Sequence, residues 1–219
     1  LQINTAVFYS DYDGFQTPLT VSLGTITAGR FLNLQARVRG VEVETAWSPL
    51  NRLQLLANYS YLDTEITEGC CFVDNADPTA TAPGAQPRGV FPNGDVSQML
   101  VGNRLPITPQ HKWTVGANYT WGFSAGSFTA GGTYTDIGAQ QSTIWMNPIY
   151  TSPSFGLADV RLLWNDAQNR YTVIGFVKNA FDEIGYGSMT GGTPTPVGVR
   201  RSVSLTFPRT YGMELQYRF

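Results

Sequence analysis

The last thirteen residues, Phe207 to Phe219, constrain the fold most, because two kinds of side chain alternate along them. One set is apolar or aromatic and consists of Tyr211, Met213, Leu215, Tyr217 and Phe219. A period of two predicts a strand whose successive side chains point to opposite faces. The stretch has the length of a strand that crosses a membrane within a β-barrel, about 9–11 residues. A half-buried strand of a soluble β-sandwich has the same pattern, so the choice between the two folds depends on the other strands.

The composition favours contact with something other than bulk water. Charged residues make up 14% of the 219 residues, compared with about 25% in ordinary soluble proteins, and aromatic residues reach 13%. The net charge of −2 argues against a nucleic-acid partner. No apolar run approaches the roughly 20 residues of a transmembrane helix, so a membrane would be crossed by strands.

The same alternation recurs along the chain and predicts eight strands, each longer than the average soluble strand of about 5–6 residues. The expected ranges are 1–13, 34–47, 52–63, 110–121, 128–137, 155–164, 170–179 and 211–219. The facing of the seventh strand stays open, because Tyr171 and Val173 on one face and Ile174 and Phe176 on the other are all apolar.

The connections between these strands alternate in length. Long loops are expected over 14–33, 64–109, 138–154 and 180–203, and short turns over 48–51, 122–127 and 165–169. Outer-membrane barrels sort their connections in this way, with short periplasmic turns on one rim and long extracellular loops on the other. Trp113 and Trp121 also lie roughly 20 Å apart along the membrane normal, near the ~25 Å apolar band between aromatic girdles. The sequence therefore predicts an all-β, antiparallel transmembrane β-barrel.

Several charged residues occupy polar positions of the predicted strands. These lumen-facing candidates are Glu42, Glu44, Lys112, Asp159 and Arg161. Glu42 and Glu44 share a face, as the two acids of a glycosidase do, but like charges side by side without an evident apolar pocket are more simply groups that face a hydrated channel or a plug.

The loop aromatic residues, the histidine and the two cysteines do not suggest a catalytic or metal site. Phe91, Trp145 and Tyr150 lie in the predicted long loops, where they would either stack on a ligand or pack loop against loop. His111 is the only histidine, and no Ser or Asp is placed to complete a triad with it. The adjacent Cys70 and Cys71 predict a vicinal disulfide or two free thiols rather than a metal site. We expect no enzyme activity and no cofactor.

Four segments, in order along the chain, resemble motifs of TonB-dependent outer-membrane receptors. They are RGVEVETAWSPLNRLQLLANYSYLDTE at 39–65, LPITPQHKWTVGANY at 105–119, VKNAFDEIGY at 177–186, and the closing PRTYGMELQYRF. The third resembles the family's N-L-F-D-x-x-Y motif, with Ala180 in place of the usual Leu.

This resemblance implies that residues 1–219 are about eight C-terminal strands of a 22-stranded barrel, without its N-terminal plug and earlier strands. It implies a receptor and transporter in the bacterial outer membrane for energy-coupled uptake of a scarce nutrient, most often a ferric siderophore. The implied partners are outer-membrane lipid, the TonB system through the missing N-terminal part, the small-molecule ligand, and the barrel-assembly machinery at the closing strand. The alternative is a self-contained small outer-membrane barrel with an adhesin or structural role.

Overall fold

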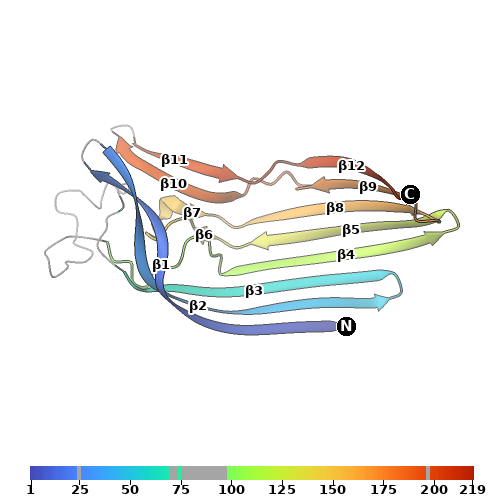
Figure 1. Ribbon diagram of the computed structural model, residues 1–219, viewed down its shortest axis with the longest axis horizontal. Helices are drawn as coiled ribbons and strands as arrows, with labels where there is room; N and C mark the ends of the chain where they lie inside the picture. Colours follow the sequence, from blue (N-terminus) through green and yellow to red (C-terminus); the bar gives the residue numbers. More distant parts are fainter. Residues whose placement is uncertain (24–25, 70–73, 75–97, 196–197) are drawn as a thin grey trace.

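The computed structural model describes residues 1–23, 26–69, 74, 98–195 and 198–219, and these form an almost entirely β structure. Eight strands make one antiparallel sheet in the order β1-β2-β3-β4-β5-β8-β9-β12 (Figure 1). Their bounds are Gln2–Leu23 (β1), Ile26–Leu50 (β2), Leu53–Glu68 (β3), His111–Phe123 (β4), Gly126–Ile137 (β5), Phe155–Asp166 (β8), Tyr171–Lys178 (β9) and Thr210–Tyr217 (β12). The predicted all-β antiparallel fold is confirmed.

The sheet is open in the part of the chain that the structure describes. Each of its strands pairs with the next sheet strand along the chain, and β1 and β12 form its two edges. Between β9 and β12 the chain forms a separate hairpin from β10 (Tyr186–Thr195) and β11 (Gly198–Leu205). This hairpin lies at the end of the sheet opposite the two chain termini (Figure 1).

Short turns connect the strands at the end where the termini lie (Figure 1). Their backbones require left-handed residues: Arg52 has φ 81° between β2 and β3, and Asn169 has φ 54° between β8 and β9. Gly126 has φ 141°, and a Cβ atom there would collide with the Asn165 carbonyl oxygen. Only glycine fits this position, which explains why the β4–β5 turn can lie directly beside the β8–β9 turn.

The predicted loop over residues 14–33 is wrong, because β1 continues to Leu23 and β2 begins at Ile26. A bulge between Tyr12 and Phe15, with Gly14 at φ 74°, interrupts the pairing, which then resumes. The hairpin extends this far for two reasons. The backbone groups of β1 and β2 form hydrogen bonds with one another, and Leu32 and Leu34 pack in an apolar core beyond the expected membrane region.

Two other predicted loops contain regular structure. The segment 180–203 includes most of the β10–β11 hairpin, and 138–154 includes β6 (Gln140–Gln141), a 3-10 turn (Pro148–Tyr150) and β7 (Thr151–Ser152). β3 also extends to Glu68, five residues past its predicted end at Asp63. The closing strand ends at Tyr217, so Phe219 follows it rather than belonging to it.

A compact apolar core lies at the long-loop end. It consists of Leu32, Leu34, Ala36, Ile66, Leu100, Leu105 and Ile144, with Phe15, Val38 and Trp145 packed against it. The segment that follows residue 97 returns to β3, where Ile66 N donates to Asn103 O at 2.8 Å and Gly102 N donates to Ile66 O at 2.9 Å. This core fixes the long-loop segments against one face of the sheet.

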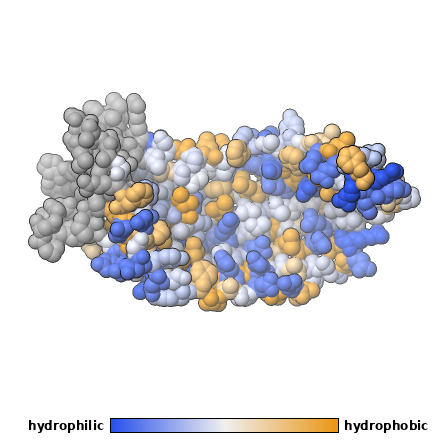
Figure 2. All heavy atoms as spheres, viewed as in Figure 1, coloured by the Kyte–Doolittle hydropathy of each residue, from blue (hydrophilic) through white to orange (hydrophobic). Residues whose placement is uncertain are grey.

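In the described ranges, no helix has the length and apolarity that a bilayer crossing requires. On the face shown in Figure 2, hydrophobic and hydrophilic residues are intermixed along the strands, and one group of hydrophilic residues lies at the short-turn end.

Candidate functional site

The strand register divides the sheet into an apolar face and a polar face. Across β3, β4 and β5, Ala57 pairs with Val115 and Val115 with Tyr134, all on the apolar face. The neighbouring row, on the polar face, contains Asn58, Thr114 and Thr135. The apolar core packs on the polar face, since Ala36 and Ile66 share the parity of Glu42 and Ser60. The long-loop segments therefore cover the polar face, as expected for the inside of a barrel.

The register also settles the facing of β9. Val173 pairs with Trp164 and Leu215 on the apolar face, whereas Phe176 pairs with Arg161 on the polar face. The alternating residues of β12 lie on the apolar face and are largely exposed, Tyr211 at 80% and Met213 at 79%. Phe219 stacks edge-on against Tyr217 with ring centroids 5.3 Å apart.

Aromatic side chains border the apolar face at both ends. At the short-turn end, Tyr119 and Trp121 have centroids 4.6 Å apart, and Tyr171 and Tyr217 are 5.0 Å apart. The long-loop belt includes Tyr9, Tyr59, Tyr61, His111, Trp113 and Tyr134. Between the belts, the apolar face carries mainly aliphatic side chains together with Gly, Ala and Thr. Two aromatic belts around an apolar band are typical of a surface that faces lipid.

The polar face is lined by short hydroxyl and amide groups. Thr114 and Thr135 join their Oγ1 atoms at 2.9 Å, and Thr120 and Thr129 do so at 2.8 Å. Gly131 leaves room for the Asn118 side chain, because a Cβ atom there would meet Asn118 Cγ at 3.0 Å. These groups form hydrogen bonds with one another across the strands. Because the side chains are short, they leave space above the polar face that water can occupy.

Three of the predicted lumen-facing residues come together on this wall. Ser60 of β3 pairs with both Glu42 and Lys112, so Glu42, Ser60 and Lys112 lie in one row across the strands. A shallow depression of about 260 Å³ is lined on this face by Glu42, Glu44, Asn58, Ser60, Lys112 and Thr114. Glu42, Glu44 and Lys112 are exposed, and none of them takes part in an ion pair within the described chain. The depression can therefore offer charge of both signs to a polar group.

The other charged pair on the polar face has a different environment. Asp159 and Arg161 lie on β8, away from the depression, at the same spacing as Glu42 and Glu44. Asp159 Oδ1 accepts a hydrogen bond from Asn179 N at 2.8 Å. Asp159 thus has a structural task at the end of β9, while Arg161 is exposed beside Phe176.

Two of the three loop aromatics that could stack on a ligand, Trp145 and Tyr150, are packed. Trp145 lies against the apolar core, and Tyr150 is 2% exposed with its hydroxyl donating to Asp74 Oδ1 at 3.1 Å. Phe91, Cys70 and Cys71 lie outside the described residues. In this arrangement Trp145 and Tyr150 hold loop against loop. The described residues contain no group of three or more side chains suited to binding a metal ion.

Asn179 is a junction that sequence reasoning missed. Its side chain donates to Glu183 O at 2.9 Å and to Phe207 O at 3.0 Å, and it accepts from Glu183 N at 2.9 Å. The residue is buried and has φ 49°, a conformation that Asn tolerates better than most residues. It therefore joins the end of β9 to the residues before β12. The motif in 177–186 was the available signal, but the partner Phe207 lies 28 residues away.

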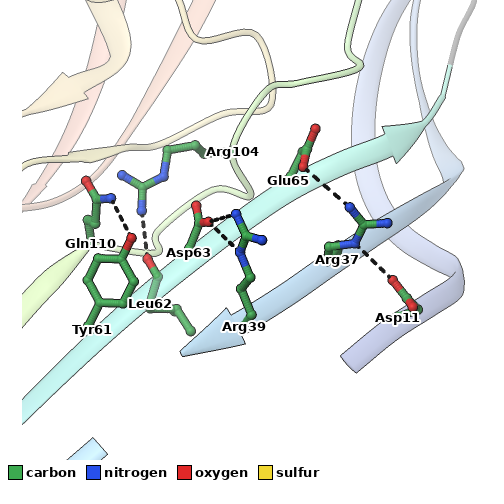
Figure 3. Close-up of polar contacts among 9 residues, drawn as sticks. All are labelled: Asp11, Arg37, Arg39, Tyr61, Leu62, Asp63, Glu65, Arg104 and Gln110. Atoms are coloured by element: carbon green, nitrogen blue, oxygen red, sulfur yellow. Dashed lines mark hydrogen bonds and ion pairs between the residues drawn. The ribbon is translucent and has the colours of Figure 1, made fainter. Parts of the chain in front are cut away.

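A second missed feature is a strip of charged residues on the apolar face, beyond the long-loop aromatic belt (Figure 3). We call it the outer charged strip; it consists of Asp11, Arg37, Arg39, Asp63 and Glu65. Arg39 Nη2 lies 2.7 Å from Asp63 Oδ2, and this hydrogen bond raises the pKa of Arg39 above its ordinary value. The charge of Tyr9, followed by the hydrogen bond to Asp11, raises the pKa of Arg37.

A family model described as TonB dependent receptor-like, beta-barrel, matches residues 1–180. None of the curated proteins matches the chain in sequence. Several solved structures share its fold, including the ferric yersiniabactin uptake receptor FyuA from Yersinia pestis, with a TM-score of 0.69, 17% identity, and coverage of 99% of this chain.

Two further structures have similar folds. The copper transporter OprC matches with a TM-score of 0.65 and 13% identity over 100% of this chain. The siderophore receptor PiuA from Acinetobacter baumannii matches with a TM-score of 0.64 and 14% identity over 98%. This chain spans only 27% of FyuA, 29% of OprC and 26% of PiuA. At these identities the likeness establishes the fold alone.

Proposed function

This chain belongs to the TonB-dependent receptor family of β-barrel proteins, which reside in the bacterial outer membrane, and from that premise we propose that it forms part of the wall of an energy-coupled nutrient transporter. The family is one of transport receptors, and no catalytic reaction is part of the proposal. The observation that carries it is the two-sided sheet, with an aromatic-bordered apolar face and a hydrophilic face partly covered by long-loop segments.

We propose further that residues 1–219 are the C-terminal portion of a larger barrel domain. The open sheet supports this, because unpaired strand edges are not tolerated in lipid and β1 and β12 need neighbours. A self-contained barrel would instead require β1 to pair with β12, and in this structure they are opposite edges. The exposed apolar residues of β12 suit recognition by the barrel-assembly machinery.

The proposed cargo is a ferric siderophore. Structures of similar fold include receptors named for ferric yersiniabactin, ferric preacinetobactin and ferripyoverdine, although a copper transporter is among them. In the proposal, the polar face lines the path that the cargo follows past the plug domain. Glu42, Glu44, Lys112 and Arg161 are among the charged residues that would face this path, and energy would come from the TonB system through the plug.

Uptake of labelled iron tests the proposal. A strain without the complete receptor should lose accumulation of ⁵⁵Fe supplied as one member of a panel of ferric siderophores, and the intact gene should restore it. Uptake should also stop in a strain without TonB. Unchanged iron uptake together with lost ⁶⁴Cu uptake would replace the siderophore with copper as cargo. Normal uptake of both metals in the deletion strain would reject the transport proposal for these cargoes.

A further inference from the structure

The outer charged strip begins where the apolar face of three neighbouring strands changes character. Along β1 the exterior residues run from Val7 through Tyr9 to Asp11. On β2 they run from Val41 to Arg39 and Arg37, and on β3 from Tyr61 to Asp63 and Glu65. The register aligns Tyr9 with Arg39 and Asp11 with Arg37. On β1 and β3 an aromatic side chain precedes the charged ones, and on β2 Val41 is followed directly by Arg39, so the charged side chains come last on all three strands, as at a membrane–water boundary.

The strip faces outward, away from the cargo path. Arg37 and Arg39 alternate with Ala36 and Val38, whose side chains contribute to the core on the opposite face. The side chains of Arg39, Asp11 and Glu65 are 58%, 62% and 44% exposed. Neither the core nor the described long-loop segments packed on it cover these groups, so they are open to the surroundings of the barrel.

The two guanidinium groups are held in place but are not saturated. Arg39 directs Nε and Nη2 at a single oxygen, Asp63 Oδ2, at 2.8 and 2.7 Å. Arg37 makes longer contacts, from Nε to Asp11 Oδ1 at 3.4 Å and from Nη1 to Glu65 Oε2 at 4.0 Å. Each guanidinium has five N–H donors, so several remain available. Exposed ion pairs are weak, and a better acceptor can compete with these carboxylates.

We propose that Arg37 and Arg39 bind the phosphate groups of an outer-leaflet lipid headgroup. The proposal rests on the proposed function, because it requires the long-loop rim to face outside. Guanidinium groups bind phosphate through charge-assisted, often bidentate hydrogen bonds. Residues 37 and 39 lie roughly 7 Å apart along one strand face, which allows them to engage one diphosphorylated headgroup together.

The carboxylates of the strip have a part in this surface. Asp11, Asp63 and Glu65 exceed the two arginines by one negative charge. Mg²⁺ binds phosphate oxygens well, so Mg²⁺ carried by the headgroup would reduce the repulsion between these carboxylates and phosphate. The tyrosines of the long-loop belt lie directly below, at the depth where aromatic rings with a polar tip favour the membrane interface.

The test measures lipid binding to the complete receptor in detergent with Mg²⁺, using native mass spectrometry and diphosphoryl lipid A as the probe. We expect the variant Arg37→Gln with Arg39→Gln to bind lipid A at least about tenfold more weakly than wild type. Arg170→Gln with Arg218→Gln removes an equal charge at the short-turn rim and should leave the affinity unchanged. Lipid A stripped of its phosphates should bind wild type and the double variant equally weakly.

Unchanged affinity in the folded double variant, or equal binding of phosphorylated and phosphate-free lipid A to wild type, would overturn the proposal. Unaltered heat-modifiable gel mobility establishes folding. If the double glutamine variant fails to fold, Arg37→Lys with Arg39→Lys keeps the charge but loses the planar guanidinium groups that bind phosphate bidentately. The affinity of this variant for lipid A should still fall severalfold, and an affinity equal to that of wild type would overturn the proposal.

The orientation is checked separately by labelling single cysteines on intact cells, in a background where Cys70 and Cys71 are replaced by Ser. A cysteine at Thr190 should react and one at Asn51 should not. The reverse pattern would reject the orientation in the proposed function, whereas normal labelling with unchanged lipid affinity would reject only the lipid site.

Discussion

Ala117 and Asn118 are neighbours in β4 whose side chains meet different surroundings. Ala117 lies in the middle of the apolar band, so Ala117→Arg should destabilise the complete receptor by about 2–4 kcal/mol. Asn118→Arg places the same side chain on the polar face and should cost much less. Denaturant unfolding of both variants in lipid measures the difference. If the Asn118 variant were the less stable one, the two faces would have to be exchanged.

Asp166 shows how one carboxylate stabilises a short turn. Its Oδ1 atom accepts a hydrogen bond from Tyr171 N at 2.7 Å, and this bond lowers the pKa of Asp166 below its ordinary value. A group whose pKa is lower in the folded state stabilises the fold above its unfolded pKa, about 3.9 for Asp, and loses this contribution as the pH falls through the folded value.

We therefore expect Asp166→Asn to be less stable than wild type by a constant amount between pH 5 and 8, with the gap narrowing below about pH 4. Unfolding curves of both proteins between pH 3 and 8 provide the measurement. A gap that widens on acidification would contradict the assigned role of the Tyr171 hydrogen bond.

Among the elements, the junction at Asn179 determines how the β10–β11 hairpin is held. Asn179→Ala removes three side-chain hydrogen bonds and should cost about 1–3 kcal/mol locally. We expect trypsin to cleave after Arg201 faster in this variant, because the base of the hairpin loosens.

Asn169→Ala is the matched control. Asn169 also has positive φ, but its side chain makes no hydrogen bond within the described part of the chain. The backbone penalty is therefore the same in both variants, and only the Asn179 variant should be cleaved faster after Arg201. Equal cleavage in both variants would assign the effect to the backbone conformation.

The elements also show what sequence patterns can and cannot predict. Period-two alternation predicted the strands and both faces of β4 and β12, because a lipid-facing strand must alternate. It missed the outer part of β1 and β2, where the sense of the alternation is reversed: Leu32 and Leu34 on the inner face pack in the apolar core, while Asn33 on the outer face is exposed. The facing of β9 needed the register with β8 and β12, since both of its faces are apolar.

The candidate site was predictable only in part. Alternation assigned Glu42, Glu44 and Lys112 to the polar side, but their common depression depends on the pairing of three strands. The packing of Trp145 and Tyr150 depends on contacts with distant segments, as does the outer charged strip. Such groupings arise from register, which a single strand does not contain.

At the scale of the whole molecule, we predict that these 219 residues alone do not close into a stable barrel. A closed barrel of eight strands needs side chains that fill its interior, whereas positions such as Gly116, Gly131 and Thr133 fill little. Refolding in detergent, followed by comparison of boiled and unboiled gel mobility, tests this. The complete receptor is the positive control. A heat-modifiable, protease-resistant monomer of the 219 residues would show that the edges do pair.

The sorting of long and short connections to opposite rims separates two kinds of evolutionary change. Insertions, deletions and replacements in the long segments alter the surface that first meets an arriving molecule, and they leave the pairing of the strands below unchanged, since each strand is held by neighbours across tight turns. In the proposed transporter, selection for a new cargo would therefore act on one rim while membrane anchoring stays constant. Related chains should accordingly differ in length almost entirely at this rim.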